Sequence, residues 1–237
     1  MFRGTAPYYV RYRPGYPPDL LEELGVAAGL DRTSRLLDLG CGPGTIAVPL
    51  APFVREVLAV DSEPEMLAEL RRIAPPNVVA LHARAEDVDA TWGMFRLATI
   101  GRALHWFDGE LVLSRLVGLT PAVALLGDSL DQSEALTAVL EVARELLGER
   151  PPMRLPGIRY EQALAGSAFS LVDELWAMVD RTWTVDQLIG FAYSTSFASP
   201  VRIGDRRDEF EATMRARLKP QYRERLRVSA LLGRCVP

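Results

Sequence analysis

The sequence predicts an α/β fold in which helices cover a mostly parallel sheet. Up to about residue 130, short apolar runs alternate with amphipathic stretches, and a glycine-rich loop, GCGPG at 40–44, directly follows one of the apolar runs. Strict alternation of strands and helices implies βαβ units, whose strands are parallel. A Pro/Gly-rich connector at 148–157 then introduces a stretch of different character. We expect one domain over 1–237, with a C-terminal elaboration over the functional site.

Each expected element follows from the positions of apolar residues, glycines and prolines. Leucines at helical spacing predict a helix over 18–29 that ends near Gly29. Pro49 should shorten or kink the helix expected at 45–54. Apolar runs predict strands at 36–39, 57–60, 78–81, 97–100 and 122–126. The remaining helices of this half are expected at 64–73, 111–119 and 133–147.

The C-terminal part carries a different pattern. Residues 171–183 show the alternation of a strand, and 185–193 read as a short helix. The polar STS at 194–196 is interpreted as a turn, with the alternative that it offers hydroxyls to a polar substrate. A charged helix over 207–219 should follow, and 226–235 should pair as an antiparallel edge strand. Acidic residues interleave with the arginines of 202–227, which favours a solvated surface over an RNA-binding one.

Composition excludes several classes of protein. The 237 residues are 49% hydrophobic and 24% charged, with a net charge of -4, so no general field attracts nucleic acid or acidic membrane. Cys41 and Cys235 form no metal-binding pattern or disulfide framework. The first residues lack the apolar core of a signal peptide, and no apolar run reaches the roughly 18 residues of a membrane span. We therefore expect a cytoplasmic protein without metal, membrane or nucleic acid.

The glycine loop raises the question of its ligand. Dinucleotide-binding loops carry G-x-G-x-x-G, whereas this loop is G-x-G-x-G and has Thr45 where the third fingerprint glycine belongs. Pro43 also removes one backbone N–H that a phosphate would need. S-adenosylmethionine has an adenosine but no phosphate, so this spacing favours it. Asp61, at the end of the second strand, could accept both ribose hydroxyls of either ligand.

The chain at this point resembles class I S-adenosylmethionine-dependent methyltransferases. LLDLGCGPGT (36–45), VDSEPEML (60–67) and HARAEDV (82–88) resemble three successive motifs of that family. YVRYRPGYP (9–17) and IGRALHWFD (100–108) resemble a bacterial branch that methylates small molecules. The resemblance implies a Rossmann-like, doubly wound sheet of seven strands, with a helical cover at 1–34, a cofactor-binding core at 35–150 and substrate-covering elements at 151–237. It also implies a small-molecule methyl acceptor, such as a specialised metabolite.

The resemblance carries over to particular residues. The methionine part of the cofactor would be lined by Asp38, Gly40, Cys41, Gly42 and Gly101. The ribose would be bound by Asp61, and the ribose and adenine would be flanked by Ser62 and Met66. The adenine edge would be met by Ala85 and Glu86, and the pocket would be closed by Tyr9 and Arg13. Arg13 would pair with the methionine carboxylate. Arg96 opens the fourth strand where the family often has Asp. Met66 could equally be a core residue, and Cys41 is interpreted as a packing residue.

His105 and Trp106 are the candidate catalytic residues. They follow the fourth strand, at the edge of a parallel sheet where ligands bind. His105 could take a proton from an acceptor, or it could only hold its loop. Trp106 could form a wall of the substrate pocket or belong to the core. O-, N- and C-methylation stay open, as do monomer and homodimer. The alternatives are an NAD(P)-dependent oxidoreductase and a cofactor-binding protein without transferase activity, such as a sensor, lyase or cyclase.

Overall fold

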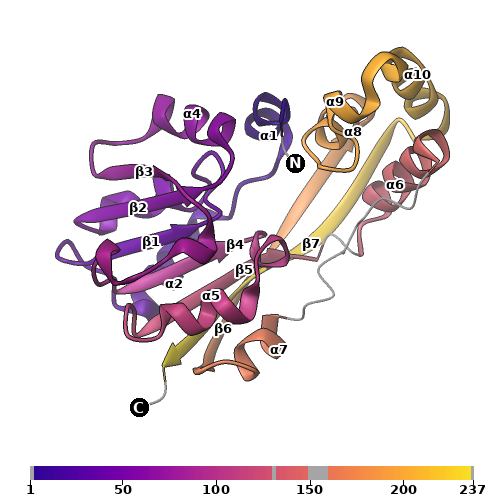
Figure 1. Ribbon diagram of the computed structural model, residues 1–237. Helices are drawn as coiled ribbons and strands as arrows, with labels where there is room; N and C mark the ends of the chain where they lie inside the picture. The colour runs from indigo at the N-terminus through magenta and orange to yellow at the C-terminus, as the bar shows by residue number, and fades with distance from the viewer. Residues whose placement is uncertain (1–2, 130–131, 149–159, 236–237) are drawn as a thin grey trace. The chain divides into compact units, whose positions relative to one another are not determined.

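The computed structural model describes residues 3–129, 132–148 and 160–235 (Figure 1). The chain divides into two compact units, each built from three segments. The sheet unit comprises 16–128, 156–177 and 228–237. The helical unit comprises 1–15, 129–155 and 178–227. The connector expected at 148–157 lies, beyond Gly148, outside the described residues.

A sheet of seven strands forms the framework, in the order β3-β2-β1-β4-β5-β7-β6. Strands β1 to β5 pair in parallel, and β7 is antiparallel to β5. The order reverses between β1 and β4, and such a switch point is where open α/β sheets bind ligands at the carboxyl ends of their strands. The strands are β1 (Arg35–Leu39), β2 (Glu56–Asp61), β3 (Val78–His82), β4 (Leu97–Gly101), β5 (Ala122–Asp128), β6 (Phe169–Thr184) and β7 (Gln221–Cys235).

The helices of the sheet unit follow from local signals. Pro18 and Pro64 open helices at positions where a missing N–H costs nothing. Pro49 limits its helix to four residues, which a 3₁₀ turn continues. The α-helices are α2 (Pro18–Ala28), α3 (Ala47–Leu50), α4 (Pro64–Ile73), α5 (Gly109–Leu116) and α7 (Tyr160–Ala165). The 3₁₀ turns are η1 (Ala51–Phe53), η2 (Ala85–Asp87), η3 (Ala90–Trp92) and η4 (Leu104–Trp106).

The core of the sheet unit is built from the apolar runs that predicted the strands. Leu37, Val60 and Ile100 are fully buried in one cluster with residues of α5 and β5. Strands covered on both faces read as continuous apolar runs, which is why β1, β2, β4 and β5 were visible in the sequence. Each such buried side chain contributes roughly 1.5–3 kcal/mol to stability.

The helical unit has its own core. Trp183, Phe191 and Phe210 lie in a second buried cluster, which α6, α8 and α10 form together with residues of β6 and β7. Glu224 of β7 anchors the start of α6, because its carboxylate accepts hydrogen bonds from Ser133 Oγ (2.9 Å) and the Ala135 N–H (2.9 Å). The helices are α1 (Ala6–Tyr12), α6 (Glu134–Leu147), α8 (Val185–Tyr193), α9 (Pro200–Ile203) and α10 (Arg207–Arg217), with a 3₁₀ turn η6 (Gly204–Arg206).

The structure confirms the α/β class and the antiparallel C-terminal strand, and it corrects the position of that strand. β7 lies between β5 and β6, so the edge strand at this side of the sheet is β6. The hydroxyls of Ser194 and Thr195 donate to the carbonyls of Phe191 and Ala192. The chain turns here directly after α8, as expected, and both side chains are buried.

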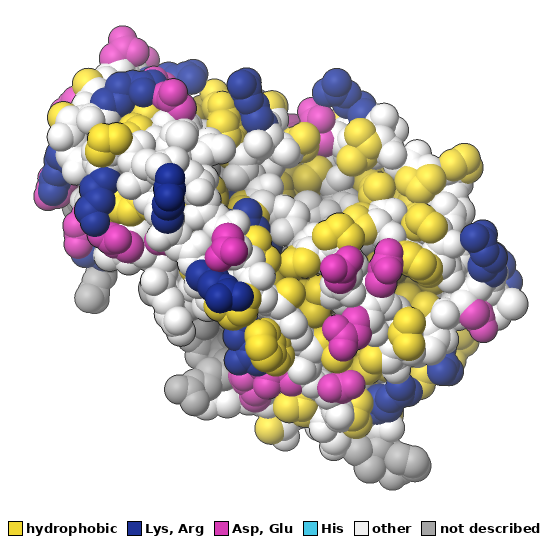
Figure 2. Space-filling view, turned by 180° about the vertical axis from the view of Figure 1, so that it is seen from behind, with side chains coloured by type: hydrophobic (Ala, Val, Ile, Leu, Met, Phe, Trp, Pro, Cys, Tyr) yellow, Lys and Arg dark blue, Asp and Glu magenta, His cyan; other side chains and the backbone are white. Residues whose placement is uncertain are grey.

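Acidic and basic side chains alternate over the face seen in Figure 2, where neither sign forms a large separate patch. In the described part of the chain, none of the helices combines the length and the apolar character needed to cross a membrane.

Candidate functional site

The glycine loop follows β1 at the switch point of the sheet. Gly40, Gly42 and Gly44 all have left-handed φ values, of +66°, +53° and +91°. A Cβ on Gly40 would lie 2.5 Å from Ala103 Cβ, and one on Gly44 would lie 2.5 Å from Leu70 Cδ1. A Cβ on Gly42 would meet nothing within 4 Å. Gly40 and Gly44 therefore permit close packing, whereas Gly42 leaves room where a ligand can approach the backbone.

Asp61 ties the end of β2 to this loop. Its Oδ2 accepts the Gly42 N–H at 2.8 Å, and its Oδ1 accepts the Glu63 N–H at 2.8 Å. Burial raises the pKa of Asp61, and these two backbone hydrogen bonds act in the opposite direction. A carboxylate has about four acceptor positions, so Asp61 keeps capacity for ligand hydroxyls beside Gly42.

Asp38 lies beneath the loop rather than on its surface. The side chain is 1% exposed, its Oδ1 accepts the Thr99 hydroxyl at 2.8 Å, and its Oδ2 accepts the Ala47 N–H at 3.1 Å. Burial raises the pKa of Asp38 to about 7, and the two hydrogen bonds oppose that rise. Asp38 thereby joins β1, β4 and the first turn of α3. The sequence predicted a contact of Asp38 with the cofactor, but it did not predict this structural role.

Cys41 behaves as the packing residue that was expected. The side chain is 4% exposed, and the Cys41 N–H donates to the Val60 carbonyl at 3.0 Å. Burial raises the pKa of the Cys41 thiol well above its ordinary value. The thiol therefore stays protonated at neutral pH and is a poor nucleophile.

Of the residues expected near the adenine, Ser62 directly follows β2, Met66 lies in α4, and Ala85 and Glu86 lie in η2. Ser62 is exposed, whereas Met66 and Ala85 are 3% and 5% exposed. Glu86 Oε1 accepts the Asp108 N–H at 3.1 Å, so this carboxylate holds the start of α5. Met66 is thus packed in the core, and Glu86 has a structural contact that its sequence position did not reveal.

His105 and Trp106 lie in η4, beyond the end of β4. Their rings are 4.7 Å apart between centroids, at 45°. His105 is half-buried, and Trp106 is 39% exposed, which contradicts the core interpretation of Trp106. A Cβ on Gly101 would lie 2.8 Å from the hydroxyl oxygen of Tyr16. Tyr16 therefore fills the space over Gly101, although only its place in YVRYRPGYP pointed to it.

Tyr9 and Arg13 belong to the helical unit and lie together there. Arg13 Nε donates to Ser194 Oγ at 2.9 Å, and its guanidinium lies over the rings of Phe191 (4.5 Å) and Tyr9 (5.3 Å). These contacts attach the segment after α1 to the end of α8. The expected role of both residues toward the cofactor stays a prediction.

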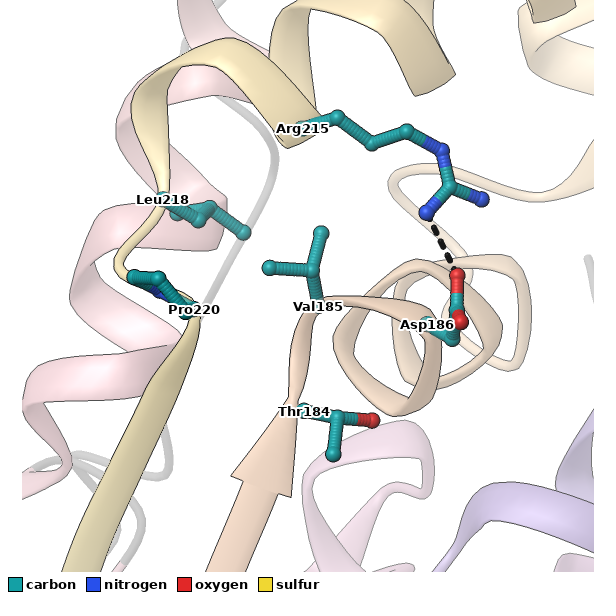
Figure 3. Close-up of a pocket in the computed structure, with 6 residues that line it drawn as sticks. All are labelled: Thr184, Val185, Asp186, Arg215, Leu218 and Pro220. Carbon is teal, nitrogen blue, oxygen red and sulfur yellow. Dashed lines mark hydrogen bonds and ion pairs between the residues drawn. The ribbon is translucent and has the colours of Figure 1, made fainter.

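A surface depression of about 390 Å³ lies elsewhere in the helical unit (Figure 3). Its polar side chains are engaged with each other, since Arg215 Nη1 and Asp186 Oδ1 are 2.5 Å apart. Val185, Leu218 and Pro220 supply its apolar walls. The depression contains none of the expected site residues, and its carboxylate, Asp186, is paired with Arg215. Within the described ranges, no cluster of His, Cys, Asp and Glu could hold a metal ion.

Comparison with known proteins places this geometry in context. Residues 36–118 match the family described as "Methyltransferase domain". An uncharacterised methyltransferase of Mycobacterium tuberculosis is 38% identical over 107 residues, which are 45% of this chain and 42% of that protein. A malonyl-[acyl-carrier protein] O-methyltransferase of Enterobacter lignolyticus is 33% identical over 161 residues, 62% of each chain. The chain thus spans less than half the length of the mycobacterial relative.

Solved structures share the fold. A S-adenosylmethionine-dependent methyltransferase from Thiobacillus denitrificans, in complex with S-adenosylhomocysteine, has a TM-score of 0.58 and 15% sequence identity, covering 100% of this chain and 99% of that one. A second such complex, from Geobacter sulfurreducens, has a TM-score of 0.57, 15% identity and coverage of 97% and 96%. At these identities the likeness concerns the fold alone.

Proposed function

Residues 36–118 match the methyltransferase domain family, and from this premise we propose that the protein is a class I S-adenosylmethionine-dependent methyltransferase that transfers a methyl group to a small-molecule acceptor. The observation that carries the proposal is the open space over Gly42 beside the carboxylate of Asp61. The relatives and structural neighbours named above are methyltransferases, which speaks against the oxidoreductase alternative.

The residues around the loop fit this cofactor. Gly42 lets a ligand approach the backbone, and Asp61 offers acceptors to ribose hydroxyls. Pro43 and the missing third fingerprint glycine make the loop a poor phosphate cradle, and this cofactor carries no phosphate. When bound, S-adenosylmethionine supplies a methyl group already activated by its sulfonium. Orientation and exclusion of water are then the main tasks of the protein, and orientation alone can contribute on the order of 7–11 kcal/mol.

We place O-methylation first among the possible reactions. The Enterobacter relative is named an O-methyltransferase, and a hydroxyl acceptor must lose a proton. Imidazole, with an ordinary pKa near 6.5, is suited to take that proton at neutral pH, and such a base contributes about 10²–10⁴-fold. His105 fills this role in the proposal because it follows β4 at the ligand-binding edge of the sheet. The exposed ring of Trp106 would form a wall for the acceptor.

Ligand-dependent unfolding tests the cofactor assignment. S-adenosylhomocysteine at a hundred times its Kd should stabilise the protein by about 2.7 kcal/mol, whereas NAD and NADP should have no effect. Stabilisation by a dinucleotide alone would refute the proposal. Release of S-adenosylhomocysteine during incubation with hydroxyl-bearing acceptors then distinguishes a transferase from a protein that only binds the cofactor.

Asp61→Asn, with Asp31→Asn as a matched control, tests the site itself. Each of the two aspartates accepts the N–H of the residue two positions later at 2.8 Å, but Asp31 lies in a turn before β1, away from the glycine loop. Loss of a charged hydrogen-bond acceptor costs about 1.5–3 kcal/mol, so Asp61→Asn should weaken S-adenosylhomocysteine binding roughly 10- to 150-fold. Asp31→Asn should leave it unchanged. Equal affinities in the two variants would remove Asp61 from the site.

A further inference from the structure

A buried charge pair, neither member of which was an expected site residue, lies at the carboxyl ends of β4 and β5. Arg102 Nη2 and Asp128 Oδ2 are 2.9 Å apart, and the two side chains are only 10% and 7% exposed. Burying two charges removes their hydration, so a pair of this kind is weak evidence for a stabilising role. Its position directly after Gly101 suggests a role in the site instead.

The backbone of Arg102 is strained. Its φ is +54°, and among the described residues no other non-glycine residue has a positive φ. Strained conformations persist only where the surroundings hold them, and they concentrate at functional sites. Here the Arg102 N–H donates to the Leu126 carbonyl of β5 at 2.9 Å. Glycine would adopt this conformation without strain, so the arginine is present for its side chain.

Two tyrosines complete the surroundings of the pair. The guanidinium of Arg102 lies 4.4 Å over the ring of Tyr16, whose hydroxyl donates to the Leu126 carbonyl at 3.5 Å. Tyr16 is the residue that fills the space over Gly101. The half-buried Tyr160 lies against the backbone beside Asp128: a Cβ on Gly127 would lie 2.7 Å from its ring. Burial, and then the charge of Asp128, raise the pKa of Tyr160 to about 12.

We propose that Arg102 is a positioning residue for methyl transfer, which fixes the turn from Gly101 to Trp106 through its ion pair with Asp128 and so holds His105 in place. The proposal rests on the proposed function, since it is the transfer reaction that requires His105 at a defined position. Arg102 acts through that turn and not on the acceptor itself. Two contacts with β5 fix the conformation of this turn: the backbone hydrogen bond of Arg102 with Leu126 and the ion pair of Arg102 with Asp128.

Imidazole NMR tests the proposal directly, because the chain contains only two histidines. His82→Gln assigns the two sets of signals. Arg102→Gln and Asp128→Asn should each shift or broaden the His105 signals and weaken S-adenosylhomocysteine binding at least fivefold. The signals of His82, whose Nε2 lies 3.1 Å from the Ser62 carbonyl, should not move. Arg102→Lys keeps the positive charge and should restore most of the wild-type His105 spectrum.

Unchanged His105 signals in both Arg102→Gln and Asp128→Asn would overturn the proposal, even if both variants unfold at lower temperature. If these variants do not fold, Arg102→Gly provides the decision, because it removes the side chain and the backbone strain together. A wild-type His105 spectrum in Arg102→Gly would again refute it. The proposed function is judged separately, by whether the wild-type protein binds S-adenosylhomocysteine, whereas the His105 signals can be recorded without any ligand.

Discussion

Replacing Asp38 by asparagine should stabilise the protein at neutral and alkaline pH, although it alters the motif of the glycine loop. The amide can keep both hydrogen bonds of the carboxylate. Its oxygen can accept the Ala47 N–H, and its NH₂ can donate to Thr99 Oγ, because a hydroxyl both donates and accepts. The Thr99 hydroxyl then donates to the Leu37 carbonyl, which lies 3.3 Å away. The substitution therefore removes a buried charge without leaving a polar atom unsatisfied.

The magnitude follows from the pKa of Asp38. Burial raises it from 3.8 to about 7 in the folded protein. The folded state thus holds the proton more tightly than the unfolded state, and the stability of the wild type falls as pH rises from about 3.8 to about 7. At 1.36 kcal/mol per pH unit, the loss amounts to about 4 kcal/mol above pH 7. Below pH 3.8 both states are protonated at this residue, and the loss vanishes.

Urea unfolding of both proteins between pH 4 and pH 8 measures this effect. The advantage of Asp38→Asn should be small at pH 4, increase by about 1.4 kcal/mol per pH unit, and level off above pH 7. Asp31→Asn is the control of opposite sign, because hydrogen bonds from Thr33 and Ser34 lower the pKa of Asp31 to about 2. Asp31→Asn should destabilise the protein, and the size of this effect should not change between pH 6 and pH 8. A stability difference between Asp38→Asn and wild type that did not change with pH would refute the reasoning.

Three further substitutions test the packing of the loop and of the helical unit. Gly40→Ala should destabilise the protein by at least about 3 kcal/mol, since backbone strain adds to a clash with Ala103. Gly42→Ala, which meets no neighbouring atom, should cost only about 1–2 kcal/mol. Thermal unfolding that showed Gly42→Ala to be the more destabilising of the two would contradict this reasoning. Glu224→Ala should cost about 3–5 kcal/mol, because it leaves Trp183 Nε1, now 3.1 Å from Glu224 Oε2, and the start of α6 without their acceptor. A cost below 1 kcal/mol in urea unfolding would show that water replaces the carboxylate.

The parts of the fold that the sequence predicts are those with local signals. Pro64 opens α4, which covers 64–73 as expected, and Pro49 shortens α3 as expected. Strands β1, β2, β4 and β5 were visible because burial on both faces makes them continuous apolar runs, whereas β3 is only partly buried. The place of β7 inside the sheet had no local signal. It depends on the pairing of Ala122–Asp128 with Val228–Arg234, a hundred or more positions along the chain.

The same distinction applies to the site. Sequence motifs identify Gly42 and Asp61 as candidate site residues, and the structure places them in hydrogen-bond contact. The bond between Asp38 and Thr99 joins residues 61 positions apart, through the register of β1 with β4. The ion pair of Arg102 with Asp128 similarly depends on β4 lying beside β5. Hydrophobic patterns reveal that strands exist, but they do not reveal which polar side chains the strand order brings together.

The division of the chain into two interleaved units has a consequence for its synthesis. Neither unit is contiguous, because the chain passes from one to the other at 15/16, 128/129, 155/156, 177/178 and 227/228. The sheet unit needs residues 228–235 as the antiparallel partner of β5, so β5 keeps an open edge until these residues have left the ribosome. No single cut yields either unit as one intact fragment, and a nascent chain stalled before residue 228 would present an apolar strand to its neighbours.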